Sequence, residues 1–333
     1  MSPPSLDLHR NHSFLDLVSY GRRGPGDGSR LSPAQIAHIE RTVRRTPEVM
    51  VKISGGGQSV RAVAAHFKYL ARRDFEIETD DGEQLKGREP VKALLEDWEL
   101  DLDAVESRRS YRGTPGRKPV KLVHNIVLSM PAGTPAAGVL NASRNFAREQ
   151  FALRHRYAMV LHTDQPHPHV HLVLKAMSEQ GNRINIRKET LREWRREFAR
   201  HLRAQGIAAN ATSRAVRGVI KPHKRDGTYR AMRAGRSTHW QGRVETVAEG
   251  LRAGRPPTES GGARLLDTRR AVIQGWLGLR DSLRADGREG QARDVERFLK
   301  GMPPPRTERE WIAQNLLLHA RKGSDREREA LTR

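Results

Sequence analysis

Residues 157–175, YAMVLHTDQPHPHVHLVLK, contain the pattern that decides the fold. Two apolar runs, 157–162 and 169–175, flank the short loop TDQPHP, and this arrangement predicts a β-hairpin. Helical patterns precede and follow the hairpin, at about 136–152 and 187–205. Strands interleaved with helices, with at least one adjacent antiparallel pair, favour an α+β fold over a doubly wound parallel sheet. We expect the helices to cover one face of the sheet.

The hairpin also concentrates histidine. Successive side chains of a strand point to opposite faces, so His169 and His171 share one face, and His162 at the end of the preceding strand returns beside them. Three neutral imidazoles with further positions left open are typical of a catalytic metal site. We therefore predict a divalent metal, Mg²⁺ or Mn²⁺, held by these three histidines. Asp164, two residues after His162, is suited to orient an imidazole or to accept a proton.

Two alternatives remain at this cluster. The histidines could be surface residues of a polar loop that bind metal adventitiously, although a His-x-His pair with a third histidine upstream makes this less favourable. His167 in the loop is a candidate fourth ligand, but its spacing places it less well. The acidic HxHxDH order of metallo-hydrolases is absent from the sequence, which leaves phosphodiester chemistry as the better fit.

The composition indicates the kind of partner. The chain has 61 Lys and Arg against 39 Asp and Glu, a net charge of +22, and such an excess favours nucleic acid. We find no lipidation signal, no basic amphipathic helix and no apolar run near the ~18 residues of a membrane span. With no cysteine, disulfides and thiolate sites are excluded. Without a recognisable signal peptide, the expected location is the cytoplasm.

Composition also divides the chain into four expected regions. Residues 1–46 are basic and broken by Pro and Gly, which indicates an N-terminal extension with one helical stretch. Strand-like alternation from residue 48 opens a catalytic domain expected over 47–220. The Gly, Arg and Pro content of 221–262 predicts a linker. Residues 263–333 are expected to be helical, in two segments separated by MPPPRTERE, with no function that the sequence reveals.

A metal-activated phosphodiester needs a nucleophile, either water or a side chain. In the helix expected over 58–73, apolar side chains at i, i+3, i+4 and i+7 form one face, and Tyr69 lies about half a turn away from it. His66, Arg72 and Arg73 flank the phenol, which needs cationic neighbours or a base to ionise. Tyr69 is thus the candidate nucleophile. An ordinary amphipathic tyrosine at a helix boundary is the open alternative.

The glycines at 55–57 precede this helix and allow two interpretations. They could let the backbone approach a phosphate at the helix N-terminus. They could equally form a simple strand-to-helix turn, and because no GxxxxGK follows, they are not a nucleotide-binding loop.

Four stretches in order resemble conjugative relaxases. These are mobilisation nucleases of the His-hydrophobe-His endonuclease class, and the similarity is closest to the group that includes the tumour-inducing-plasmid relaxase. The stretches are KISGGGQSVRAVAAHFKYLARR (52–73), HNIVLSMPAGT (124–134), HTDQPHPHVH (162–171) and ATSRAVRG (211–218). The resemblance covers about 48–220. It departs from the family at Pro166, where a second acid is usual.

The resemblance implies a five-stranded antiparallel sheet flanked by helices, with Tyr69 at the nucleophile position. It implies that Ser129 contacts DNA. Further candidate DNA contacts are basic side chains near the tyrosine and in the fourth motif: Arg72, Arg73, Arg214 and Arg217. A solvated basic loop is the alternative for the last two.

The activity implied is a site- and strand-specific nick at the transfer origin of a plasmid or integrative element. Attack by the tyrosine would leave a 5′-phosphotyrosine and a free 3′-hydroxyl. The implied partners are single-stranded origin DNA, relaxosome accessory proteins and the coupling protein of a type IV secretion system, with transfer to the recipient cell on the DNA.

Two other functions are consistent with the sequence. A replication initiator or transposase of the same class usually carries its tyrosine after the histidines, and here only Tyr229 lies downstream. A non-catalytic DNA-binding accessory protein is the other alternative, although the intact tyrosine and histidines argue against it.

Overall fold

The computed structural model describes residues 31–72, 75–111, 120–219, 231–232 and 234–331. The chain forms two compact units. We call residues 45–211 the sheet unit, and we call the described residues up to 44 together with those from 212 onward the helical unit. None of the helices in the described part of the chain is long and apolar enough to cross a membrane.

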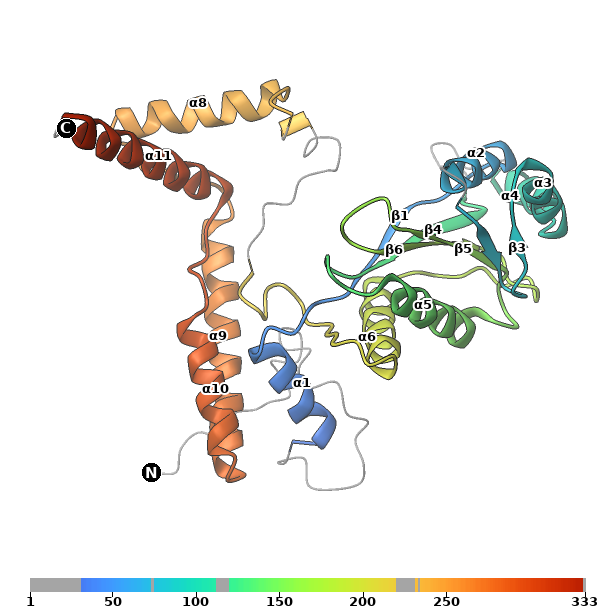
Figure 1. Cartoon of the computed structure of the whole chain (residues 1–333), viewed down its shortest axis with the longest axis horizontal. Coiled ribbons are helices and arrows are strands. Elements are labelled where there is room, and N and C mark those ends of the chain that lie inside the picture. Colours follow the sequence, from blue (N-terminus) through green and yellow to red (C-terminus); the bar gives the residue numbers. More distant parts are fainter. Residues whose placement is uncertain (1–30, 73–74, 112–119, 220–230, 233, 332–333) are drawn as a thin grey trace. The chain divides into compact units, whose positions relative to one another are not determined.

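The sheet unit is built on one antiparallel sheet of six strands (Figure 1), in the order β1-β4-β6-β5-β2-β3. The strands are β1 (Met50–Gly55), β2 (Ile77–Thr79), β3 (Gln84–Leu85), β4 (Val123–Ser129), β5 (Tyr157–His162) and β6 (His169–Lys175). β5 and β6 form the predicted hairpin, with His162 opposite His169. The α+β class with an antiparallel sheet is confirmed, and the short pair β2 and β3 brings the strands to six instead of five.

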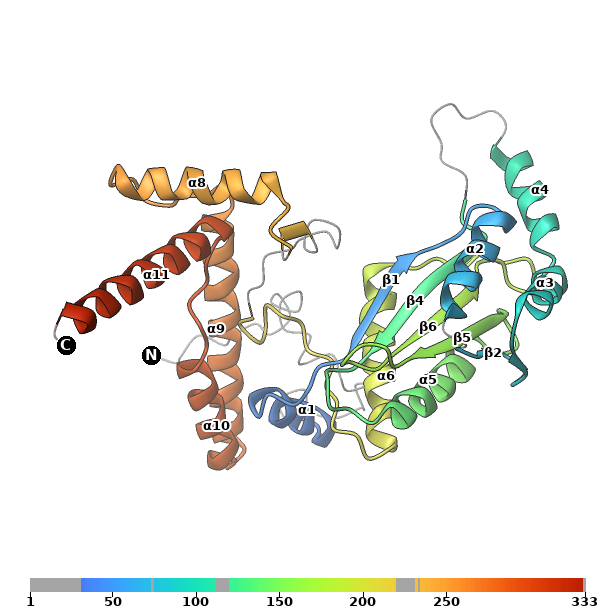
Figure 2. The same ribbon diagram turned by 45° about the horizontal axis from the view of Figure 1, so that its top comes forward.

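Helices cover both faces of this sheet, so the expectation of helices on one face is wrong. One face carries α5 (Ala136–Phe151) and α6 (Lys188–Ala204), and the other carries α2 (Val60–Leu70), α3 (Arg88–Asp97) and α4 (Leu100–Tyr111), as Figures 1 and 2 show together. The physical reason is visible in the central strands. β4 is buried at nearly every position, which requires apolar cover on both sides.

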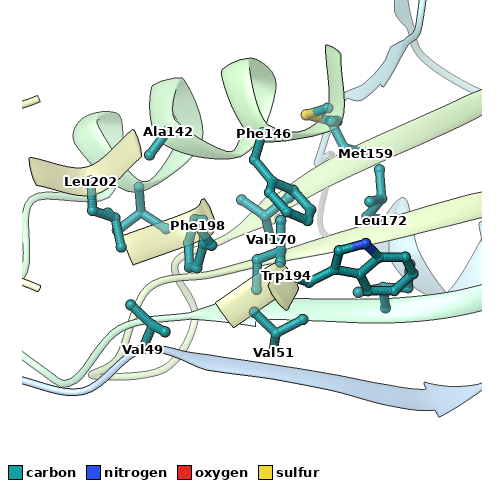
Figure 3. Close-up of a cluster of buried hydrophobic side chains, with 14 of the residues drawn as sticks. Val49, Val51, Ala142, Phe146, Met159, Val170, Leu172, Trp194, Phe198 and Leu202 are labelled. Carbon is teal, nitrogen blue, oxygen red and sulfur yellow. The ribbon is translucent and has the colours of Figure 1, made fainter. Parts of the chain in front are cut away.

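The larger core lies between the sheet and helices α5 and α6 (Figure 3). Phe146 of α5 meets Trp194 and Phe198 of α6 edge to face, with ring centroids 6.3 and 6.1 Å apart. Val170 and Leu172, alternate residues of β6, point into this core. The intervening residues of β6 therefore face the opposite side, where the histidines lie.

A second core fills that opposite side. α2 contributes the fully buried Val63, Phe67 and Leu70, and Trp98 packs edge to face on Phe67 at 6.0 Å. Helices α3 and α4 were not expected from the sequence, although Val91, Leu94, Leu95 and Trp98 have the i, i+3, i+4, i+7 spacing of an amphipathic helix. These two helices hold α2 against the sheet and so fix the position of Tyr69.

The helical unit contains α1 (Pro33–Val43), α8 (Thr238–Arg252), α9 (Gly262–Ala285), α10 (Glu289–Lys300) and α11 (Glu308–Leu331). The helix expected in the N-terminal extension is present as α1, and Ser32 and Gln35 close its N-terminus as a capping box. Ile39 of α1 packs in one core with Val216 and Trp276. The indole N–H of Trp276 donates to the Val216 carbonyl at 2.9 Å, which fastens the chain after residue 212 to α9.

Two parts of the helical unit differ from expectation. The stretch 221–262, predicted as a linker, contains α8, whose apolar side chains Trp240, Val244, Val247 and Leu251 pack against α11. The Gly and Arg residues around these apolar side chains hide their helical spacing in the sequence. The two helical segments expected after residue 263 are three, because Gly287, at φ 70°, ends α9 in a left-handed turn before α10. The functional boundaries of the four regions remain predictions.

Candidate metal and nucleophile site

The structure brings the three predicted ligand histidines together. His162 ends β5, and His169 and His171 lie on β6, so the hairpin register sets His162 directly opposite His169. One ring nitrogen from each histidine lies within 4.8 Å of those of the other two. The ring centroids are 4.7 to 5.3 Å apart. In the described part of the chain this is the group with the geometry of a metal site, and His167 is not a member of it.

Backbone carbonyls fix which nitrogen of two rings carries the proton. His162 Nε2 lies 2.9 Å from the Leu70 carbonyl and His169 Nδ1 lies 3.2 Å from the His167 carbonyl. A carbonyl only accepts, so each of these nitrogens is the donor. The lone pair is thereby assigned to Nδ1 of His162 and to Nε2 of His169. Carbonyl partners of this kind orient metal-binding histidines in proteins.

The unpaired buried nitrogens fit a bound cation. Nδ1 of His162 and Nδ1 of His171 are buried and have no hydrogen-bond partner among the described residues. A buried acceptor without a partner is costly, unless a ligand completes it. Three neutral nitrogen donors suit Mn²⁺ by affinity, whereas Mg²⁺ prefers oxygen, so donor chemistry alone favours the former.

Burial keeps the triad uncharged. Desolvation lowers the pKa of His162 and of His169, and the same burial, with the neighbouring His162 and His169, lowers the pKa of His171 to about 3. Neutral imidazoles are the metal-binding form. The site is therefore in its ligating state throughout the neutral pH range.

Tyr69 lies at the C-terminal end of α2, directly before the Leu70 carbonyl that accepts from His162. Its side chain is 53% exposed, away from the buried face of α2, as the sequence predicted. His66, one turn earlier on α2, lies between the tyrosine and the triad. The His66 ring stacks on Tyr69 at 6.2 Å and meets His171 edge to face at 6.4 Å. The phenol and the histidines thus share one face of the sheet unit.

An arginine fastens the end of this helix to the histidine loop. The Arg72 guanidinium lies 4.2 Å above the Tyr69 ring and 3.0 Å from an Asp164 carboxylate oxygen. It also donates to the Tyr69 carbonyl at 3.2 Å. Arg72 was predicted as a DNA contact and Asp164 as an imidazole partner or base. In the structure they pair with each other, and through that pair they position the tyrosine.

The remaining predicted residues lie in several places. Ser129 of β4 lies directly opposite His169 on the neighbouring strand β6 and is only 3% exposed, so it adjoins the triad but does not reach the surface. Arg73 lies outside the described residues. Arg214 and Arg217 belong to the helical unit, so the structure does not join them to the triad. The roles of all four as DNA contacts remain predictions.

The glycines before α2 have a packing reason. A Cβ on Gly56 would lie 2.4 Å from the Val123 carbonyl oxygen, and one on Gly57 would lie 2.4 Å from a Val63 methyl. The Gly57 carbonyl accepts from the backbone N–H of Leu122 at 2.7 Å. These contacts favour the strand-to-helix turn over a phosphate loop.

Phe75 is a site residue that was not predicted from the sequence. Its ring stacks on His162 at 4.6 Å and 26°. The sequence offered one signal, an isolated aromatic residue shortly after the tyrosine helix, but nothing in it related Phe75 to a histidine 87 positions later.

The buried neutral histidines predict a loss of stability in acid. The pKa of His124 is lowered to about 4 by burial and by nearby Lys121, and that of His171 to about 3, whereas in the unfolded chain both are ordinary. Below about pH 6.5 the unfolded state therefore binds more protons, so the free energy of unfolding falls as the pH falls. Between pH 7 and pH 5 we expect the metal-free protein to lose on the order of 1 kcal/mol, after allowance for solvent screening. Urea denaturation at the two pH values measures this, and equal or greater stability at pH 5 would contradict it.

Part of the sheet unit is similar to the nuclease domain of relaxases. Residues 94–207 match the family model described as relaxase, MobA/VirD2-like, nuclease domain. The matched residues lie within the sheet unit. The match includes all three histidines of the triad, and it begins after Tyr69.

Curated relatives belong to the same group. The chain is similar to the T-DNA border endonuclease VirD2 of Rhizobium radiobacter, at 26% identity over 189 residues, covering 52% of this chain and 44% of that protein. It is 32% identical to the protein of the same name from Rhizobium rhizogenes, covering 52% and 42%. The chain therefore spans less than half the length of these relatives. A solved structure reported under the heading "Molecular Basis of Vancomycin Resistance Transfer in Staphylococcus aureus" aligns with 50% of this chain and 99% of its own, at 15% identity and a TM-score of 0.31.

Proposed function

We propose that this protein is a DNA-nicking relaxase that cleaves one strand at a transfer origin through a tyrosine nucleophile. The observation that supports this most is the contact chain from Tyr69 through His66 to His171. It joins a nucleophile candidate on α2 to the triad on β5 and β6. A second link, from His162 to the Leu70 carbonyl, connects the same two elements.

The proposed chemistry is a transesterification. The Tyr69 oxygen attacks the scissile phosphorus, the new bond is the tyrosyl ester, and the bond to the 3′-oxygen breaks. The phenolic proton is lost to solvent or a base, and the departing 3′-oxygen takes up a proton. The phosphodiester energy is retained in the ester, so that the strand can be rejoined. Arg72 holds the Tyr69 ring from above, which limits the rotamers that the nucleophile samples.

His162, His169 and His171 would hold a divalent ion, Mn²⁺ or Mg²⁺. When bound, such an ion neutralises charge on the non-bridging phosphate oxygens. The carbonyls of Leu70 and His167 keep two of these rings in the tautomer that exposes a lone pair inward. The proposed partners are single-stranded origin DNA, relaxosome accessory proteins and the coupling protein of a type IV secretion system.

Incubation with single-stranded oligonucleotides tests the proposal. Strands covering the transfer origin, labelled at either end, are mixed with the protein and Mn²⁺ or Mg²⁺, then separated on a denaturing gel. We expect a protein-linked band that carries the 3′ portion of the strand, and its loss on chelation with EDTA. Cleavage without a protein-linked band would mean that water is the nucleophile.

The domain assignment predicts that a fragment ending near residue 220 retains cleavage. The triad, Tyr69 and both cores of the sheet unit all lie before that point. We expect its rate on a short single-stranded oligonucleotide to be within a few-fold of the full chain. If the fragment folds, as judged by circular dichroism, but does not cleave, residues after 220 belong to the catalytic unit.

A further inference from the structure

A large cavity opens beside the tyrosine helix, on a side of α2 different from the one that carries Tyr69. Its volume is about 720 Å³, within the range of ~300–1,000 Å³ typical of small-molecule sites. The floor is apolar and comes from α2, α3 and the segment after α2: Val60, Ala64, Ala71, Phe75, Val91 and Leu95. The cavity lies wholly within the sheet unit. Neither the triad nor the nucleophile lines it.

Phe75 connects this cavity to the metal site. The Phe75 ring stacks on His162 at 4.6 Å, and Phe75 also lines the cavity. Lys68 stands at the rim and is the residue directly before Tyr69. A ligand in the cavity would therefore be separated from the triad by one aromatic ring, and from the nucleophile by part of one helical turn. Such a position suits a group attached to the substrate itself.

The charges at the rim favour a polyanionic chain. Four basic side chains, Arg61, Lys68, Lys86 and Lys92, face two acids, Glu96 and Asp101. Lys86 pairs with Glu76 at 2.8 Å and Lys92 lies 3.7 Å from Glu96. Among the described residues, Arg61 and Lys68 make no ion pair. Two uncompensated cations above an apolar floor with an aromatic wall match a flat base carried on a phosphate backbone.

We infer that this cavity, named here the α2–α3 pocket, receives an unstacked nucleobase of the single strand close to the scissile phosphate. Arg61 and Lys68 hold the adjoining phosphates, and the base lies among the apolar side chains beside Phe75. Binding the base anchors the strand, so that the next phosphate is presented to Tyr69. This inference rests on the proposed nicking function, because it assigns a subsite for the same substrate.

Filling the pocket tests the inference. Ala64→Trp places an indole on the floor, and Ala65→Trp, at an exposed position, places one at the mouth without entering the core. Ala93→Trp is the matched control, because Ala93 is an exposed alanine of α3 that does not line the pocket. The probe is a set of fluorescent origin-strand oligonucleotides in which one abasic site is moved position by position. Dissociation constants are measured by anisotropy in EDTA, so that cleavage does not interfere.

For the wild type and Ala93→Trp, we expect one or two neighbouring abasic positions near the nick to weaken binding about tenfold, in line with the loss of one stacked base. The pocket-filling variants should bind the intact strand about tenfold more weakly. In these variants, an abasic site at the same positions should cause no further loss of affinity. If the abasic site weakens binding by Ala64→Trp and Ala65→Trp as much as it weakens binding by the wild type, the inference is overturned. Unchanged affinity of these variants for the intact strand also overturns it, and would indicate that the pocket binds a protein segment instead. If Ala64→Trp fails to fold, Ala65→Trp decides the question.

The readouts separate this inference from the proposed function. Adduct formation with metal reports on nicking, whereas the abasic penalty in EDTA reports on the pocket alone. A wild type that binds with the expected abasic pattern but forms no adduct would contradict the nicking mechanism and leave the pocket supported. A wild type that forms the adduct, but whose affinity does not depend on the position of the abasic site, would contradict the pocket inference and leave the nicking mechanism supported. Absence of both binding and adduct contradicts both.

Discussion

His171→Ala is expected to reduce metal-dependent cleavage by at least about 1,000-fold, because removal of one of three ligands costs several kcal/mol of charge stabilisation in the transition state. The ring centroid of His171 lies 4.7 Å from that of His162 and 5.1 Å from that of His169. Binding of single-stranded DNA in EDTA should change little, since affinity comes from many dispersed phosphate contacts. Gel cleavage assays, anisotropy, and calorimetric titration with Mn²⁺ measure the three effects separately.

His167→Ala is the matched control. It removes an imidazole from the same loop, and its ring lies 5.4 Å from His169 but outside the triad. The carbonyl that orients His169 belongs to the backbone and remains in this variant. We expect cleavage and metal affinity within a few-fold of the wild type. Equal losses of DNA binding and cleavage in His171→Ala would indicate a structural role for the triad instead.

Tyr69→Phe is expected to remove both the nick and the protein-linked strand, to below detection. The change deletes one hydroxyl from a side chain that is 53% exposed, so the free energy of unfolding should stay within about 0.5 kcal/mol. The Phe ring can still stack beneath Arg72, so the ion pair between Arg72 and Asp164 should persist. The variant would thus lose cleavage while keeping its fold. Thermal unfolding with and without Mn²⁺ checks that its stability and metal binding are unchanged.

Two other tyrosines serve as controls. Tyr157→Phe alters a buried residue of β5, and Tyr229→Phe alters the tyrosine that lies after the histidines, outside the described residues. Both should leave the protein-linked strand in place. An adduct that survives Tyr69→Phe but disappears with Tyr229→Phe would favour the order found in replication initiators.

The hairpin and its histidines could be predicted because they depend on local periodicity. Alternation along β6 determines that His169 and His171 share a face, and a six-residue loop determines that His162 returns beside them. The Tyr69 side of α2 could be predicted for the same reason, since a helical stripe of apolar residues defines the opposite face. Each of these conclusions needs only neighbours within a few residues.

Contacts between distant segments could not be predicted in this way. The pairing of Arg72 with Asp164 joins residues 92 positions apart, and the stacking of Phe75 on His162 depends on how α2 lies over the sheet. That helices cover both faces of the sheet was not predicted, because α3 and α4 were not recognised in the sequence. Without these two helices the second core has no outer layer. The α2–α3 pocket follows from the same packing, so the sequence alone contained no sign of it.

The most direct test is to locate the nucleotide on the protein. The wild type is allowed to react with a single-stranded origin oligonucleotide and Mn²⁺, the adduct is digested with nuclease and protease, and the modified peptide is sequenced by mass spectrometry. We predict a nucleotide joined through its 5′-phosphate to Tyr69, in the peptide that begins after Lys68. A nucleotide on Tyr229, on another side chain, or on no peptide at all although the strand is cut, would contradict it.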